Sequence, residues 1–197
     1  GSISLFGKEL KPKSEYISIK NGIAFVTENR RETGFFHNSD IQENISILPF
    51  IKSSKLGGTW GLINSKMEKK YADDEKKKLN IKCSSINQNI TELSGGNQQK
   101  VILGKWMAAE SSLIIFDEPT KGIDVGSKSE IYTLMRKLSD EGKGVLMVSS
   151  ELPELLAVCD KIAVFKNGEI AEILSADEAT EEKIMYILTH EGDMKND

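Results

Sequence analysis

Continuous apolar runs alternate along the chain with segments whose apolar residues recur at helical spacing. The run at residues 113–116 predicts a strand that is buried on both faces, and the runs at 23–27 and 145–148 predict further buried strands. The periodic segments that follow residues 94 and 126 predict helices with one apolar face each. Because strands that alternate with helices form parallel sheets, the chain is predicted to have an α/β core.

The last fifty residues carry a different pattern. Residues 161–174 predict a hairpin, because the Asn167-Gly168 pair is typical of a tight type I′ turn. A short helix is expected near residues 152–156, before the hairpin, and another is expected to begin at Thr180. In this last helix, we expect the apolar side chains to face inward: Ile184, Met185, Ile187 and Leu188.

Residues 38–90 differ from the rest of the chain, because they are rich in lysine, weakly apolar and interrupted by glycines. Two motifs resemble capping boxes, Ser39-x-x-Gln42 and Ser65-x-x-Glu68. They predict helices near residues 40–47 and 65–79. The segment is therefore predicted to be an inserted helical subdomain.

Two apolar stretches of this subdomain, residues 48–51 and 60–63, leave two interpretations open: subdomain core or an exposed docking patch. The lysines of residues 69–78 are interpreted as a solvated helix face, because acidic residues lie between them. Phosphate or lipid binding is the alternative for these lysines. Nearer the start, residues 3–6 predict a short strand and residues 14–19 a weak helix.

The composition limits the classes of function. Of the 197 residues, 39% are hydrophobic and 28% are charged, which suits one soluble domain with a substantial core. The net charge is −4 and the charges of both signs are mixed, so no nucleic-acid partner is expected. Cys83 and Cys159 have no Cys-x-x-Cys partner, which argues against a disulfide framework or a zinc site. They are expected to be inert, buried thiols, and no apolar run approaches the ~20 residues of a membrane span.

Two segments in the middle of the chain carry the chemistry. Residues 93–100 read Leu-Ser-Gly-Gly-Asn-Gln-Gln-Lys, a glycine turn that leads into a helix, and the free amides at a helix start favour phosphate. About a dozen residues later, the strand at 113–116 ends in Asp117 and Glu118, followed by Pro119-Thr120. Carboxylates at the end of such a strand lie where open α/β sheets bind ligands.

In this order and spacing, the two segments resemble the signature motif and the Walker B strand of ABC-type ATPase cassettes. Taken separately, they also fit a glycine-rich turn and an ordinary buried strand. The Asn-Gln-Gln-Lys ending of the first segment, together with residues 121–126, is similar to sugar importers of the ribose and galactose type. Within these, the chain resembles most the second, C-terminal cassette of the galactose/methyl galactoside type. The likeness extends to about His190. The chain is therefore predicted to be a truncated P-loop NTPase core, one partial nucleotide-binding domain over 1–197.

The resemblance also implies a division of this domain and a set of site residues. A RecA-like α/β core over 1–37 and 91–197 would flank the helical subdomain of 38–90. Asp117 is expected to hold Mg²⁺ through water, and Glu118 to orient or deprotonate the attacking water. Two cassettes of the family pair head to tail, so four residues are expected to contact the ATP of the partner cassette: Ser94, Gly95, Gly96 and Gln98.

Three further residues are expected at the nucleotide site. Asp124 lies in the loop that corresponds to the D-loop. Glu28 stands where the family has a glutamine that touches the metal and the water, although its loop also fits a merely solvated turn. Ser150 stands where many cassettes have a switch histidine, and a serine donates one hydrogen bond but carries no charge. His37 and His190 are both expected on the surface.

The phosphate cradle of the family, G-x-x-x-x-G-K-[ST], does not occur in the sequence. Together with the first residue, which is Gly1 rather than Met, this suggests a piece of something longer whose cradle lies upstream. The 197 residues alone are then expected to bind ATP poorly and not to turn it over.

The resemblance implies partners and a location as well. These are a second ABC cassette in the N-terminal half of the parent chain, membrane permease subunits, and indirectly a sugar-binding protein. The location is the cytoplasmic face of the membrane. Two other functions stay open: a non-catalytic docking cassette that completes the partner's ATP site, and an SMC-like DNA-repair ATPase. The second is disfavoured by the acidic charge and the absence of a coiled coil.

Overall fold

The computed structural model of the protein describes residues 2–11, 14–52 and 64–190. These residues belong to two compact units, Gly1–Leu146 and Met147–Asp197. Each unit is described by itself below. The division of the chain into a RecA-like core and a helical subdomain stays a prediction.

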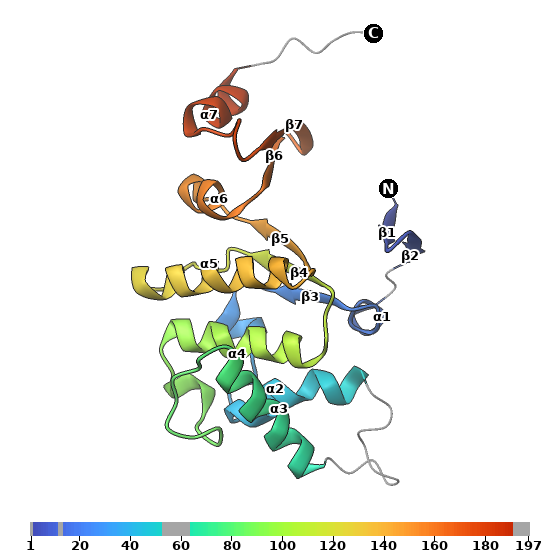
Figure 1. Cartoon of the computed structure of the whole chain (residues 1–197), viewed down its shortest axis with the longest axis vertical. Coiled ribbons are helices and arrows are strands. Elements are labelled where there is room, and N and C mark those ends of the chain that lie inside the picture. Colours follow the sequence, from blue (N-terminus) through green and yellow to red (C-terminus); the bar gives the residue numbers. More distant parts are fainter. Residues whose placement is uncertain (1, 12–13, 53–63, 191–197) are drawn as a thin grey trace. The chain divides into compact units, whose positions relative to one another are not determined.

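The first unit is built around a sheet with the strand order β3-β4-β5 (Figure 1). β3 (Ile23–Val26) pairs in parallel with β4 (Leu113–Asp117), and β5 (Gly144–Val148) starts in this unit. The parallel pair confirms the predicted α/β core. Apolar side chains of β3 and β4 are fully buried on one face: Ala24, Val26, Ile114 and Phe116.

The opposite face of β3 is partly open, because Phe25 is 45% exposed. The prediction of a buried strand at residues 23–27 is therefore right for one face of β3 and wrong for the other. An apolar run indicates a strand but does not tell how many of its faces are covered.

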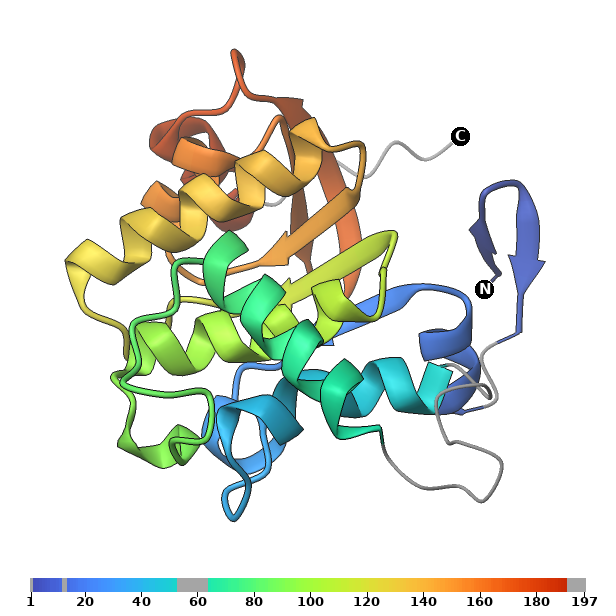
Figure 2. The same ribbon diagram turned by 60° about the horizontal axis from the view of Figure 1, so that its bottom comes forward.

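Three helices of this unit, α2 (Ile41–Lys52), α3 (Ser65–Lys78) and α4 (Gly95–Ala108), lie together in both views (Figures 1 and 2). α4 also packs against β3. The motif of residues 93–100 is therefore attached to the sheet through the helix that it starts, because ten residues of this helix are buried.

α2 is longer than the helix predicted at residues 40–47, and Pro49 lies inside it. Leu48 and Pro49 are buried, whereas Ile51 is 39% exposed. The stretch 48–51 is thus mainly core, which favours the first of the two interpretations. The other stretch, residues 60–63, lies outside the described residues.

The starts of α2 and α3 are capped by the residues that directly neighbour those predicted. At α2, the Glu43 amide donates to Asp40 Oδ1 over 2.8 Å and the Asp40 amide to Glu43 Oε2 over 3.2 Å, so the capping box lies one residue later. Asn64 caps α3 by accepting from two amides of its first turn. Asp124 caps α5 (Val125–Asp140), which begins earlier than predicted. Asp and Asn accept from these amides at least as well as Ser.

Five short elements complete the first unit. A hairpin of β1 (Ile3–Leu5) and β2 (Lys8–Leu10) precedes α1 (Glu15–Lys20), which Ser14 caps. A π-turn, η1 (Arg30–Gly34), follows β3, and a 3-10 turn, η2 (Ile90–Glu92), precedes α4. π-turns are rare and occur often at functional sites.

The second unit contains α6 (Leu152–Val158), β6 (Lys161–Lys166), β7 (Glu169–Ser175) and α7 (Glu181–Thr189). β6 and β7 pair antiparallel, and both turn residues, Asn167-Gly168, have a positive φ, which confirms the predicted hairpin. Its core consists of Ile162, Val164, Leu174 and Ile184.

Only part of the apolar set of α7 faces inward. Ile184 is 2% exposed, whereas Met185 is 47% and Leu188 36% exposed, so the inward orientation predicted for these two is wrong. The four apolar residues lie within five positions, so they cover more than one side of the helix. Only the side with Ile184 and Ile187 packs on the hairpin.

Other predictions concern single side chains. His37 and His190 are exposed, as predicted. Cys83 and Cys159 are free thiols, but each is only partly buried. None of the described helices is long and apolar enough to cross a membrane.

Candidate nucleotide site

Asp117 and Glu118 lie at the end of β4, where the chain leaves the sheet. Because Val26 is the parallel partner of Phe116, β3 and β4 end at the same edge. Glu28 therefore leaves the sheet at the same edge as the two carboxylates. Asp117 and Glu118 are both partly exposed, so a ligand from solvent has access to them.

Glu118 has an unusual backbone. Its φ is 46°, in the left-handed region that residues with a side chain seldom adopt. This conformation costs roughly 1 kcal/mol or more for a residue with a Cβ. The strained backbone belongs to the residue that the sequence analysis expects to act on the attacking water.

Ser94 is the residue that precedes α4, and its hydroxyl caps no amide of the helix. The exposed Ser94 Oγ instead accepts a 2.9 Å hydrogen bond from Asn97 Nδ2. The first amides of α4 and this hydroxyl thus lie together at the helix start. Such a start is suited to an anion, because the amides carry partial positive charge.

The two glycines that follow permit close packing. A Cβ at Gly95 would lie 2.7 Å from Arg30 Nη2, and a Cβ at Gly96 would lie 2.5 Å from Ser127 Oγ of α5. Cβ atoms do not occur at such distances from other heavy atoms. The start of α4 is therefore fixed against η1 on one side and α5 on the other.

The turn between β4 and α5 connects these parts. Lys121 Nζ forms a 2.5 Å ion pair with Glu28 Oε1, which raises the pKa of Lys121. Asp124 Oδ1 accepts from the Ser127 amide over 3.0 Å, and this bond lowers the pKa of Asp124. The turn is thus joined to Glu28 by an ion pair and to the start of α5 by Asp124.

Gln98, which was expected to contact ATP, is buried, whereas its neighbour Asn97 lies beside Ser94. Gln98 is 4% exposed, and its Nε2 donates to the Ile90 carbonyl over 3.3 Å. Asn97 is the amide beside Ser94, and its Oδ1 accepts from the Lys82 amide over 2.8 Å. Nucleotide contact by Gln98 stays a prediction, whereas Asn97 is a residue that the sequence analysis missed.

Comparison with known proteins identifies the arrangement. The family model described as ABC transporter matches residues 1–121. The chain belongs to the ABC transporter family. Over 186 residues, it is 50% identical to the D-allose import ATP-binding protein AlsA of Escherichia coli, which covers 94% of this chain and 36% of that protein.

Other ABC relatives carry different sugars in their names. The ribose import ATP-binding protein RbsA of Bacillus subtilis is 43% identical, with 96% of this chain and 38% of the relative covered. The galactose/methyl galactoside import ATP-binding protein MglA of Pasteurella multocida is 44% identical, with 95% and 36% covered. The chain thus spans less than two fifths of the length of these relatives.

A solved structure supports the ABC fold. The dimeric ATP-binding cassette MJ0796, bound to ADP and Pi, has a TM-score of 0.72 at 19% identity, over 89% of this chain and 73% of that one. At this identity, the similarity shows the fold alone. It confirms the predicted ABC ATPase architecture of a parallel sheet with helices.

Ser150, the residue expected in place of the switch histidine of ABC cassettes, lies in the second unit. It follows β5, and the neighbouring Ser149 Oγ donates to Glu154 over 3.1 Å. The contribution of Ser150 to a nucleotide site formed by the first unit stays a prediction.

Mg²⁺ is the metal that ABC chemistry implies. Among the described residues, no group of three or more His, Cys, Asp or Glu gathers to hold an ion. Mg²⁺ does not require such a group, because it usually takes one or two carboxylates together with water and phosphate oxygens. Asp117, a partly exposed carboxylate at the strand end, fits this donor set.

Arg30 and Lys121 were missed as site residues because their partners are distant in sequence. Arg30 and Lys121 both contact partners about ninety residues away. The local indication of this arrangement is weak: Arg30 lies two residues after Glu28, in the polar loop that follows β3. Gln98, by contrast, had an indication of burial, because it lies one helical turn before the buried Ile102.

The far end of η1 is held by a buried lysine of the signature helix. Lys105 is 9% exposed, and its Nζ donates to the Gly34 carbonyl over 2.6 Å. A Cβ at Gly34 would lie 2.7 Å from Ile102 Cδ1, so η1 lies directly on α4. Burial lowers the pKa of Lys105 to about 8.

This pKa predicts a pH-dependent stability. Between about pH 8 and 10.5, the unfolded chain binds more protons at Lys105 than the folded chain, so the free energy of unfolding rises with pH. The expected rise from this residue is about 2–3 kcal/mol. Urea unfolding at several pH values checks it, with Lys105→Met as the variant that lacks the group. The same change at the exposed Lys137 should keep the rise; an equal rise in both variants would contradict the prediction.

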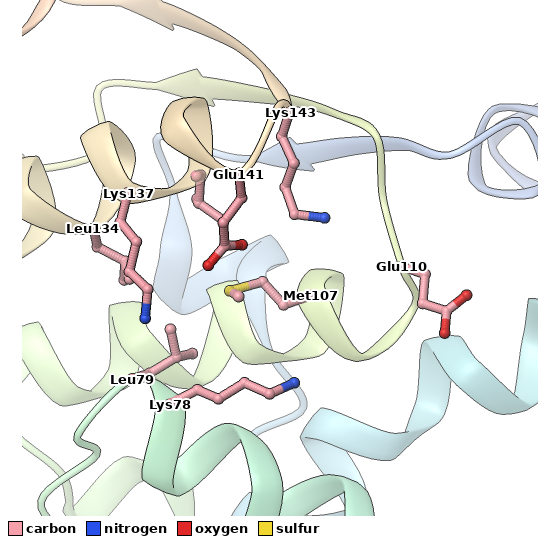
Figure 3. A pocket seen from close by; sticks show the side chains of 9 residues that line it. Lys78, Leu79, Met107, Glu110, Leu134, Lys137, Glu141 and Lys143 are labelled. Carbon is pink, nitrogen blue, oxygen red and sulfur yellow. The ribbon is translucent and has the colours of Figure 1, made fainter.

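One hollow of the first unit is separate from this site. It has a volume of about 250 Å³ and lies between α3, α4 and α5 (Figure 3). Lysine and glutamate side chains surround Leu79, Met107 and Leu134 there. None of the residues expected at the nucleotide site lines it.

Proposed function

We propose that the chain is part of the ATP-binding subunit of an ABC importer for a monosaccharide. In this proposal, Asp117 and Glu118 act on the ATP of this cassette, and the start of α4 acts on the ATP of a second cassette. One observation carries it: Ser94 and the free amides of α4 are fixed by contacts at Gly95 and Gly96, in the same unit as the two carboxylates.

The division of roles follows from the chemistry of phosphoryl transfer, in which positioning and charge stabilisation supply most of the catalysis. Glu118 accepts a proton from the attacking water or orients it. Asp117 holds Mg²⁺, which neutralises phosphate charge when bound. Ser94 Oγ and the amides of Gly95 and Gly96 donate to the phosphate of the second cassette's ATP.

The sugar is a monosaccharide of the class that the relatives import, which includes allose, ribose, xylose and galactose. The resemblance of the motifs favours galactose or a methyl galactoside, whereas the 50% identity with AlsA favours D-allose. The partners in this proposal are a second cassette, membrane permease subunits and a sugar-binding protein. The subunit works at the cytoplasmic face of the membrane.

A second candidate function is a docking cassette that completes the partner's ATP site without hydrolysing ATP itself. The ion pair between Glu28 and Lys121 favours it, because the paired Glu28 carboxylate is less available to a metal or a water. In both candidate functions, the start of α4 binds the ATP of the second cassette. They differ in whether Glu118 takes part in ATP hydrolysis.

The shared role is tested by calorimetric titration with Mg-ATP. The chain is titrated alone and then mixed with a second cassette of the same importer that contains a complete phosphate-binding loop. We expect weak binding to the chain alone, and at least about a tenfold higher affinity in the mixture, since charged hydrogen bonds to phosphate are added. Ser94→Ala should remove most of this gain. Ser4→Ala, on exposed β1, should keep it.

An unchanged affinity in the mixture would refute the role of α4. Tight binding to the chain alone would refute the division of roles, because another phosphate cradle would then have to exist within these 197 residues.

A further inference from the structure

Arg30, the first residue of η1, makes contacts with two other parts of the first unit. Its Nη1 donates to the Lys121 carbonyl over 2.8 Å and its Nη2 to the Gly122 carbonyl over 3.0 Å. The guanidinium thus holds two successive carbonyls of the turn that follows Glu118. Such a forked contact fixes orientation as well as distance, because the donors of a guanidinium form a rigid plane.

The same guanidinium lies against the start of α4. A Cβ at Gly95 would lie 2.7 Å from Arg30 Nη2 and 3.5 Å from the Gly122 carbonyl oxygen. The space that a side chain at position 95 would occupy is therefore filled by Arg30. Gly122 itself has a φ of +67°, which suits a glycine in this turn.

Arg30 also adds charge at this point. Burial, followed by the neighbouring Arg31, lowers the pKa of Arg30, and its Nε is buried without a hydrogen-bond partner among the described residues. No described ion pair joins Arg30 to a carboxylate. Its positive charge therefore adds to the positive end of α4, where a phosphate is expected.

We propose that Arg30 is a positioning residue, which holds the start of α4 and the turn at Lys121–Gly122 in one fixed arrangement for the second cassette's ATP. The proposal rests on the function proposed above. In this proposal, the Arg30 guanidinium alone fixes how the loop after Glu28, the turn at Lys121–Gly122 and the start of α4 lie against one another. Gly95 then has a second purpose besides offering its amide, because it leaves room for Arg30.

Hydrogen exchange in the chain alone tests the positioning directly. One backbone amide reports on each segment. At the start of α4, Gln98 N donates to the Ser94 carbonyl; in the turn at Lys121–Gly122, Ile123 N donates to the Thr120 carbonyl. Arg30→Ala should speed exchange at both by about tenfold, because charged hydrogen bonds are lost. Millimolar guanidinium chloride should restore slow exchange. Arg31→Ala, at the exposed neighbouring arginine, should change neither amide.

A double-mutant cycle adds a readout that general loss of stability would not move. Gly95→Ala and Arg30→Ala should each lower the affinity for Mg-ATP in the mixture with the second cassette by about tenfold. The double variant should lose no more than either single variant, because both act on one contact. Arg30→Lys keeps the charge but lacks the two forked donors, so its affinity for Mg-ATP should lie between that of Arg30→Ala and that of the original chain.

The outcomes separate the two proposals. Unchanged exchange in Arg30→Ala, or losses that multiply in the double variant, would overturn the role of Arg30. If the original chain does not change the ATP affinity of the second cassette, the proposed function of α4 is wrong. The exchange rates then still decide whether Arg30 positions the two segments.

Discussion

A glutamine in place of Glu118 is expected to slow ATP hydrolysis at this site by about 100-fold or more, because an amide does not accept the proton of the attacking water. Glutamine has nearly the same shape and meets the same left-handed backbone, so ATP binding should be preserved. The measurement is single-turnover phosphate release by the assembled importer, with the other cassette's catalytic carboxylate also replaced so that only this site contributes.

The matched control is Glu110→Gln, the same change at an exposed position after α4. It should leave the rate unaltered. If Glu118→Gln also kept the full rate, this cassette would not hydrolyse ATP through Glu118, and the docking function would be the better description.

Phe116→Ala is expected to lower the free energy of unfolding by about 3–5 kcal/mol, the usual loss when a buried aromatic side chain leaves a cavity. Phe116 is 1% exposed, and it lies on β4 directly before Asp117. Urea unfolding followed by far-ultraviolet circular dichroism measures the loss. The reaction site should loosen together with the core, because Asp117 follows this anchor.

Phe25→Ala is a control with the same chemistry on the other face of the sheet. Phe25 lies on the neighbouring strand β3 and is 45% exposed, so its removal should cost less than about 1 kcal/mol. Equal losses for Phe25→Ala and Phe116→Ala would mean that both faces of the sheet are covered in solution.

Most of the fold was accessible from the sequence, because its information is local. The Asn167-Gly168 turn and the helix after residue 94 depend on neighbours within a few residues. The Pro at position 49 shows the limit of such rules, since α2 continues through it and buries it. Exposure was predicted less well, as at Phe25, because it depends on what covers each face.

The candidate site was predictable only where it is continuous in sequence. Asp117 with Glu118, and Ser94 with its glycines, stand out as short motifs. The contacts of Arg30 span 91 and 92 residues, and no spacing rule in one sequence indicates them. The space that Gly95 leaves for Arg30 likewise becomes visible only in three dimensions.

In the proposed function, the left-handed backbone at Glu118 sets stability against activity at a single position. A glycine there would relax the backbone, with a gain of about 1 kcal/mol from the removed steric conflict. The same substitution would remove the carboxylate. Selection for a stable domain alone would therefore favour the residue that has no catalytic chemistry, so a thermostable design of this cassette has to exclude this position from optimisation.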